Sequence, residues 1–150
     1  MPTFVALLRG INMGGRNLLP MMDLARLFEE AGCAGVRTYI QSGNVLFTAS
    51  RARAEKLPGL IASGIADRFG YRIPVLLRTA AELGETIRQN PYVQAGAPEK
   101  WLHVLFLASQ PDAQRVAALD PLRSPTDAYA VRGREIYLQC PNGVGNTKLT

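Results

Sequence analysis

Several residue types are scarce in this chain, and each scarcity argues against a class of protein. The 150 residues contain two cysteines, Cys33 and Cys140, with no C-x-x-C spacing, so we expect neither a disulfide scaffold nor a metal site. The single histidine, His103, has no serine elbow or nearby carboxylate that would make it a catalytic base. The carboxylates have no spacing that suits a metal, and nothing in the sequence selects a cofactor or a catalytic residue.

Long apolar runs are missing as well. The first apolar stretch, residues 4–8, stops at Arg9 and has no basic segment before it, so we expect no signal peptide. No stretch approaches the roughly 18 to 20 apolar residues that span a bilayer, so we expect no membrane partner. Together with the reduced thiols that two isolated cysteines imply, these features predict a cytoplasmic protein.

The overall composition is that of an ordinary globular protein. Hydrophobic residues make up 47% and charged residues 19%, which excludes a disordered or fibrous chain. A chain of this length fits one compact domain or two small halves that share a core. The formal net charge of +5 comes mainly from dispersed arginines and favours anionic partners, although solubility alone explains it equally well. The sequence does not fix the oligomeric state.

Hydrophobic periodicity predicts the order β-α-β-β-α-β for residues 1–79. The uniformly apolar first strand should be central in its sheet, whereas Pro74 cannot donate to a strand ladder and places the fourth strand at an edge. Both features fit a split β-α-β, ferredoxin-like arrangement. The expected strands are at 3–11, 36–41, 45–48 and 71–78. The first expected helix begins at Pro20 and ends at Gly32. A second helix follows the third strand, and Pro58 either lies near its start or bends it.

After a connector at residues 80–100, which includes helical stretches, the pattern begins again. A strand at 101–108, a short helix at 111–119 and hairpin strands at 128–132 and 135–139 repeat the β-α-β-β order. We therefore expect an α+β fold with two ferredoxin-like subdomains in one compact unit. The first is residues 1–79, and the second, residues 101–150, is an incomplete β-α-β-β-(α) copy that is cut short after a glycine-rich loop.

The loop at residues 9–17 is the strongest functional signal. It carries two arginines, two asparagines and three glycines, and no acidic residue occurs before Asp23. Glycines let backbone N–H groups turn toward a ligand, and a following helix N-terminus favours negative charge. Arginine binds phosphate or carboxylate through two parallel hydrogen bonds. The loop therefore predicts an anion site.

The expected topology brings a second segment to this loop. The loop after the first strand and the hairpin between the second and third strands should emerge at the same end of the sheet. Alternatively, the asparagines only close turns, the hairpin residues only make the hairpin, and Arg9 pairs with a backbone carbonyl. The candidate ligand-binding residues are Arg9, Asn12, Gly14, Gly15, Arg16, Asn17, Gln41, Ser42 and Asn44, with Lys148 of the glycine-rich loop as a separate anion contact.

Our leading hypothesis is a protein that binds a phosphorylated small molecule or a nucleotide in this pocket. The first alternative is an enzyme that works by electrostatic stabilisation in the same pocket. The second is nucleic-acid binding through the dispersed arginines. Residues 143–148 do not match a P-loop, because the lysine does not follow a glycine directly, and residues 45–48 lack the aromatic run of RNA-binding sheets.

Several motifs also resemble a known family. Arg-Gly-Ile-Asn-x-Gly-Gly at 9–15, Pro20-Met21 and Thr-Tyr-Ile-Gln-Ser-Gly-Asn-Val at 38–45 look like the bacterial domain-of-unknown-function family 1697. Gly-Val-Gly at 143–145 with Lys148-Leu149 is similar to that family's later segment, with Thr147 where serine is common. The resemblance implies two similar ferredoxin-like subdomains and no established activity. Family members usually continue through a further helix, so the resemblance implies that a site built partly from that tail is incomplete here.

Overall fold

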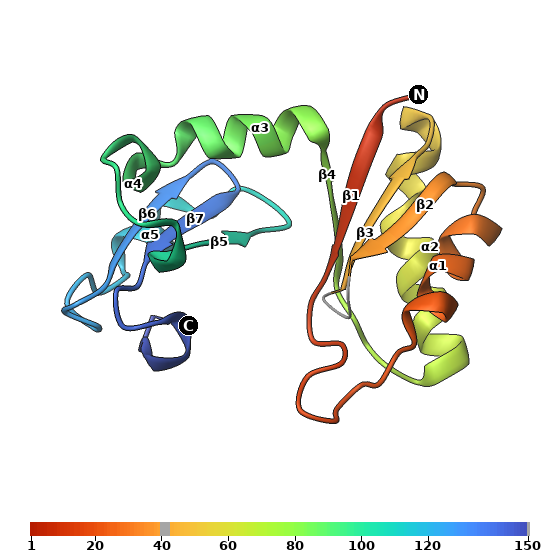
Figure 1. Ribbon diagram of the computed structural model, residues 1–150, viewed down its shortest axis with the longest axis horizontal. Coiled ribbons are helices and arrows are strands. Elements are labelled where there is room, and N and C mark those ends of the chain that lie inside the picture. The colour runs from red at the N-terminus through yellow and green to blue at the C-terminus, as the bar shows by residue number, and fades with distance from the viewer. Residues whose placement is uncertain (40–42, 150) are drawn as a thin grey trace. The chain divides into compact units, whose positions relative to one another are not determined.

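The computed structural model describes residues 1–39 and 43–149; Gln41 and Ser42 lie outside this part of the chain. The chain divides into two units, Met1–Leu83 and Gly84–Thr150, and Figure 1 shows their elements. Each unit contains one antiparallel sheet, and helices alternate with the strands along the chain. The fold is therefore α+β with two sheets, as expected.

The first sheet has four antiparallel strands, β1 Thr3–Leu8, β2 Ala34–Tyr39, β3 Asn44–Thr48 and β4 Val75–Thr79. Their order is β2-β3-β1-β4, so β1 is central and β4 lies at an edge. Both predicted positions are confirmed. The register pairs Leu7 with Asn44 and Leu8 with Val75, which brings the end of β1 beside the starts of β3 and β4.

Helices α1, Met21–Glu30, and α2, Arg51–Phe69, lie on the same face of this sheet (Figure 1). The periodicity of α1 buries Leu24, Leu27 and Phe28, as predicted from the sequence. The ring of Phe47 lies 5.6 Å from that of Phe4 and 5.2 Å from that of Phe28, measured between centroids. The core of the first unit is thus one layer of side chains between the sheet and the two helices.

The helix α2 runs through Pro58 without a break in its assignment. Its first turn is capped by the Ser50 hydroxyl, which accepts a hydrogen bond of 3.2 Å from the Arg53 N–H. Gly64 faces α1, because a Cβ added there would lie 3.0 Å from Leu27 Cδ2. The absence of a side chain at Gly64 therefore allows α2 to pack closely against α1.

The largest differences from the predicted strand boundaries are at the end of β1 and the start of β4. The first strand ends at Leu8 instead of residue 11, because Gly10 takes a φ of 85° and turns the chain out of the sheet. The fourth strand begins at Val75 instead of residue 71. Pro74, which cannot donate to the ladder, lies just before it, and its carbonyl accepts a hydrogen bond of 3.5 Å from the Arg9 N–H.

The second sheet has three antiparallel strands in the order β5-β7-β6. The observed β-α-β-β order agrees with the prediction. In the part of the chain that the structure describes, no helix is both long and apolar enough to cross a membrane. The remaining elements are α3 Ala80–Gln89, α4 Pro91–Gln94, β5 Leu102–Phe106, α5 Ala113–Ala117, β6 Ala128–Arg132 and β7 Glu135–Gln139, with 3₁₀ turns at Glu99–Trp101 and Val144–Asn146.

Candidate functional site

The loop after β1 folds into a small hairpin, which we call the finger and define as residues 12–17. Met13 and Arg16 exchange backbone hydrogen bonds of 3.3 and 2.9 Å. Gly14 and Gly15 form the tip with φ values of 57° and 78°, and two positive values are typical of the tightest hairpin turns. In Figure 1 the segment after β1 extends beyond the end of the strands. The glycines therefore make a turn, and α1 begins four residues after Asn17.

The two asparagines hold the finger in shape. The side-chain amide of Asn12 donates to the Leu19 carbonyl at 2.9 Å, and its oxygen accepts from the Leu19 N–H at 2.8 Å. The amide of Asn17 donates to the Gly10 carbonyl at 2.9 Å. Both asparagines have positive φ, 51° and 49°, a conformation that Asn tolerates better than most residues. Their side chains thus close turns, as in the alternative interpretation above.

Two further contacts hold the chain segments on either side of the finger. The Tyr71 hydroxyl donates to the Leu18 carbonyl at 2.9 Å. The Leu8 N–H donates to the Gly43 carbonyl at 3.0 Å, which joins the end of β1 to the hairpin between β2 and β3. Asn44, the first residue of β3, pairs with Leu7. Gly43 and Asn44 therefore lie at the same end of the sheet as the finger, whereas Gln41 and Ser42 lie outside the described residues.

The arginines of this end are exposed cations. Arg9 and Arg16 are exposed, and neither guanidinium forms a hydrogen bond or an ion pair with residues 1–39 or 43–149. The expected alternative, in which Arg9 pairs with a buried carbonyl, does not hold for these residues. The site therefore contains two unneutralised positive charges beside a hydrogen-bonded turn. Guanidinium groups in this state are suited to phosphate or carboxylate.

A third arginine, which the prediction did not include, lies in a chain segment next to this site. Arg72 is exposed and precedes Pro74, whose carbonyl accepts from the Arg9 N–H. Its guanidinium also has no bonded partner in the described part of the chain. The signal was available in the predicted topology, since a fourth strand antiparallel to the first must start where the first ends. We call Arg9, Arg16, Arg72 and the finger the cationic rim.

Lys148 belongs to the second unit and is exposed. The glycine-rich segment before it forms a single 3₁₀ turn, Val144–Asn146. The backbone N–H of Lys148 donates a hydrogen bond of 3.3 Å to the Ser124 hydroxyl. One short turn aligns few peptide dipoles, so an anion contact at Lys148 would rest on its side-chain charge and stays a prediction.

Ser124 anchors this segment through a buried carboxylate. Its hydroxyl donates to Asp127, and both residues are buried. The hydrogen bond from Ser124, assisted by one from Thr147, holds the pKa of the Asp127 carboxyl below its ordinary value. The pKa of the nearby Cys140 thiol is raised, first by burial and then by the negative charge of Asp127. These contacts fix the chain segment after β7 and leave Cys140 protonated.

Nucleophilic and metal chemistry find no support in the described residues. Burial raises the pKa of the Cys33 thiol, and Arg53 only partly opposes this shift. No group of three or more histidine, cysteine, aspartate or glutamate side chains within residues 1–39 and 43–149 is placed to hold a metal ion. The cationic rim itself contains donors and positive charge, and no general base occurs among its named members.

Comparison with known proteins identifies the family. The family model of proteins of unknown function called DUF1697 matches residues 1–137. The chain therefore belongs to the DUF1697 family. A solved structure of a conserved bacterial protein from Streptococcus pneumoniae is similar to this DUF1697 chain with a TM-score of 0.71 at 20% identity, over 94% of this chain and 78% of that one. At this identity the likeness concerns the fold alone. No curated protein matches this DUF1697 chain.

Proposed function

We propose that the first unit binds an anionic ligand, a phosphorylated small molecule or a nucleotide, at the cationic rim. Arg9 and Arg16 hold the anion, and Arg72 adds a third charge. The observation that carries the proposal is that these guanidinium groups lack acidic partners within the described residues, although their chain segments meet at a turn fixed by hydrogen bonds. The expected contributions of Gln41 and Ser42 remain part of the proposal.

The rigidity of the finger supports a binding role. A loop already held by the Asn12 and Asn17 hydrogen bonds loses little conformational freedom when a ligand arrives, so more of the interaction energy appears as affinity. At the tip, Gly14 and Gly15 have no side chain, which lets a ligand approach their backbone closely. Both features favour a ligand that is recognised by its charge and by backbone N–H groups.

The main test is a thermal-shift screen of the protein against inorganic phosphate, sugar phosphates and nucleotides. A ligand at one hundred times its Kd stabilises a protein by about 2.7 kcal/mol, which is readily measured as a rise in Tm. We expect the double variant Arg9→Ala/Arg16→Ala to lose this stabilisation and to keep the unliganded Tm. Undiminished ligand stabilisation in the double variant overturns the proposal.

A matched control removes two charges elsewhere in the same unit. Arg51 and Lys56 lie in the first turns of α2, which follows the other end of β3, and both are exposed. The variant Arg51→Ala/Lys56→Ala has the same net charge as the double variant of the rim. We expect it to bind like the original chain, because only local charge matters for a single pocket. An equal loss in both variants points to nonspecific attraction instead.

The alternatives separate by salt dependence and turnover. Nucleic-acid binding through six or more phosphate contacts would give a steep fall of log affinity with log salt, whereas a single pocket gives a shallow one. An enzyme would convert the ligand that stabilises it, which chromatography of the incubated mixture detects. We expect a shallow slope and an unchanged ligand.

A further inference from the structure

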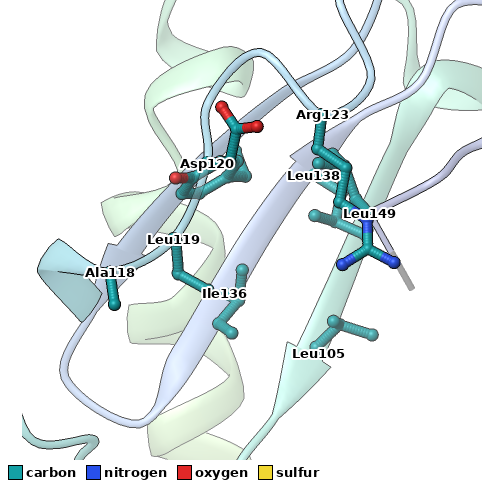
Figure 2. A pocket seen from close by; sticks show the side chains of 9 residues that line it. Leu105, Ala118, Leu119, Asp120, Arg123, Ile136, Leu138 and Leu149 are labelled. Carbon is teal, nitrogen blue, oxygen red and sulfur yellow. The ribbon is translucent and has the colours of Figure 1, made fainter. Parts of the chain in front are cut away.

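An apolar pocket lies on one face of the sheet in the second unit (Figure 2). It has a volume of about 230 Å³. Leu105 of β5 and Ile136 of β7 are neighbours in the strand register and form its floor together with Leu138. The side chains of Leu119, after α5, and Leu149, after β7, form its sides. The pocket therefore has walls from three separated segments of the chain.

One charged group faces this apolar surface. In Figure 2 the guanidinium of Arg123 hangs over the pocket between Leu149 and Leu105, whereas the carboxylate of Asp120 points away from the apolar side chains. The Asp120 carboxylate instead accepts a hydrogen bond of 2.9 Å from the Leu122 N–H. Arg123 forms no ion pair or side-chain hydrogen bond with the residues that the structure describes. An apolar floor thus lies beneath an unneutralised cation.

We propose that this pocket binds a small aliphatic carboxylate. The hydrocarbon chain lies on Leu105, Ile136 and Leu138, and the carboxylate pairs with the Arg123 guanidinium. Charge complementarity selects an acid. An uncharged apolar ligand would displace water from the Arg123 guanidinium without offering it a hydrogen-bond acceptor. This site lies in a different unit from the cationic rim and does not depend on the function proposed for it.

The volume sets the size of the ligand. A water molecule occupies about 30 Å³ of liquid, and a methylene group is similar in size, so 230 Å³ accommodates roughly six to eight such groups. Hexanoate to octanoate are therefore the probes of choice. Each buried methylene contributes about 0.8 kcal/mol, equivalent to about a fourfold change in Kd, so octanoate should bind roughly fifteenfold more tightly than hexanoate.

The experiment is isothermal titration of the whole chain with hexanoate, octanoate and 1-octanol. We expect saturable binding of octanoate at one site and the chain-length dependence given above. Arg123→Gln should weaken octanoate binding by about tenfold or more and should not weaken the binding of 1-octanol, which has no carboxylate. Arg123→Lys, which keeps the charge, should recover part of the affinity. Arg115→Gln in α5 is the matched control, because Arg115 is also exposed in this unit but does not line the pocket.

Each other outcome overturns the proposal. Three results would show that the pocket is not a specific carboxylate site. They are the absence of saturable binding, an affinity that does not depend on chain length, and equal weakening of octanoate binding by Arg115→Gln. Light scattering after size exclusion tests whether a second copy of the chain covers this face. A dimer that Leu119→Ser dissociates would assign the pocket to self-association and refute the ligand.

Discussion

The finger should be a stability element of the first unit, and Asn12 is the residue that tests this. We consider Asn12→Ala, which removes the amide that forms hydrogen bonds of 2.9 and 2.8 Å with both backbone groups of Leu19. Leu19 is only 1% exposed, so water cannot replace these bonds without a local opening. We expect the variant to fold to the same structure with a lower free energy of unfolding.

The magnitude follows from two contributions. Two hydrogen bonds at about 1 kcal/mol each give about 2 kcal/mol. Alanine at the φ of 51° that Asn12 adopts adds about 1 kcal/mol of backbone strain. The expected loss is therefore about 3 kcal/mol, which lowers the Tm of a chain of this size by roughly 6 to 12 °C.

Urea unfolding followed by circular dichroism measures this loss, with Asn12→Gly as the comparison. Glycine loses the same two hydrogen bonds but takes a positive φ without steric cost, so we expect a smaller loss of about 2 kcal/mol. A loss below about 1 kcal/mol for Asn12→Ala, with an unchanged dependence on urea, would refute the reasoning, because the finger would then not depend on its internal hydrogen bonds.

Three further predictions concern other parts of the chain. Gly43→Ala should lower the free energy of unfolding by about 2 kcal/mol or more in urea titration, because a Cβ there lies 2.7 Å from the Leu8 carbonyl oxygen at a φ of 79°; an unchanged midpoint contradicts this. Cys33, whose pKa burial raises, should react with iodoacetamide at least about tenfold more slowly in the native protein than in urea; equal rates contradict its burial. Ser124→Ala should destabilise the protein at neutral pH. Because the pKa of Asp127 is lowered in the folded state, this difference from the original chain should shrink as pH falls below about 3.9, and a difference constant with pH contradicts the linkage.

The strand order was predictable because two independent local features restricted it. A strand that is apolar on both faces is typical of the interior of a sheet. A proline beside a strand lacks the backbone N–H that a further strand would need, so it favours a position at the edge. Both rules use single residues or short runs, so they do not depend on long-range contacts. The boundaries were less predictable. The prediction extended the first strand to Ile11, but Gly10 at positive φ turns the chain out of the sheet after Leu8.

The finger itself was not predictable from composition. Glycine and asparagine are favoured both in anion-binding loops and in tight hairpins, and their preferences for positive φ are the same in the two cases. The loop is a hairpin, as the pairing of Met13 with Arg16 and the anchoring of Asn12 on Leu19 show, and the proposed anion binding rests on the arginines beside it. Those contacts depend on the exact path of the chain between β1 and α1.

The hydrogen bonds within the loop affect how the proposed cationic rim would select its ligand. The Asn12 amide is bonded to both backbone groups of Leu19, and the Asn17 amide to the Gly10 carbonyl, so we propose that both residues mainly support the site and contribute less to the choice of ligand. Arginines provide attraction for any phosphate and discriminate little between the groups attached to it. If the rim binds a phosphorylated ligand as proposed, selection among such ligands falls to the neighbouring hairpin, of which Asn44 is a described member with a half-buried side chain. In this arrangement affinity and selectivity come from different segments, so variants of the arginines should weaken all ligands alike, and only variants of the hairpin should change their ranking.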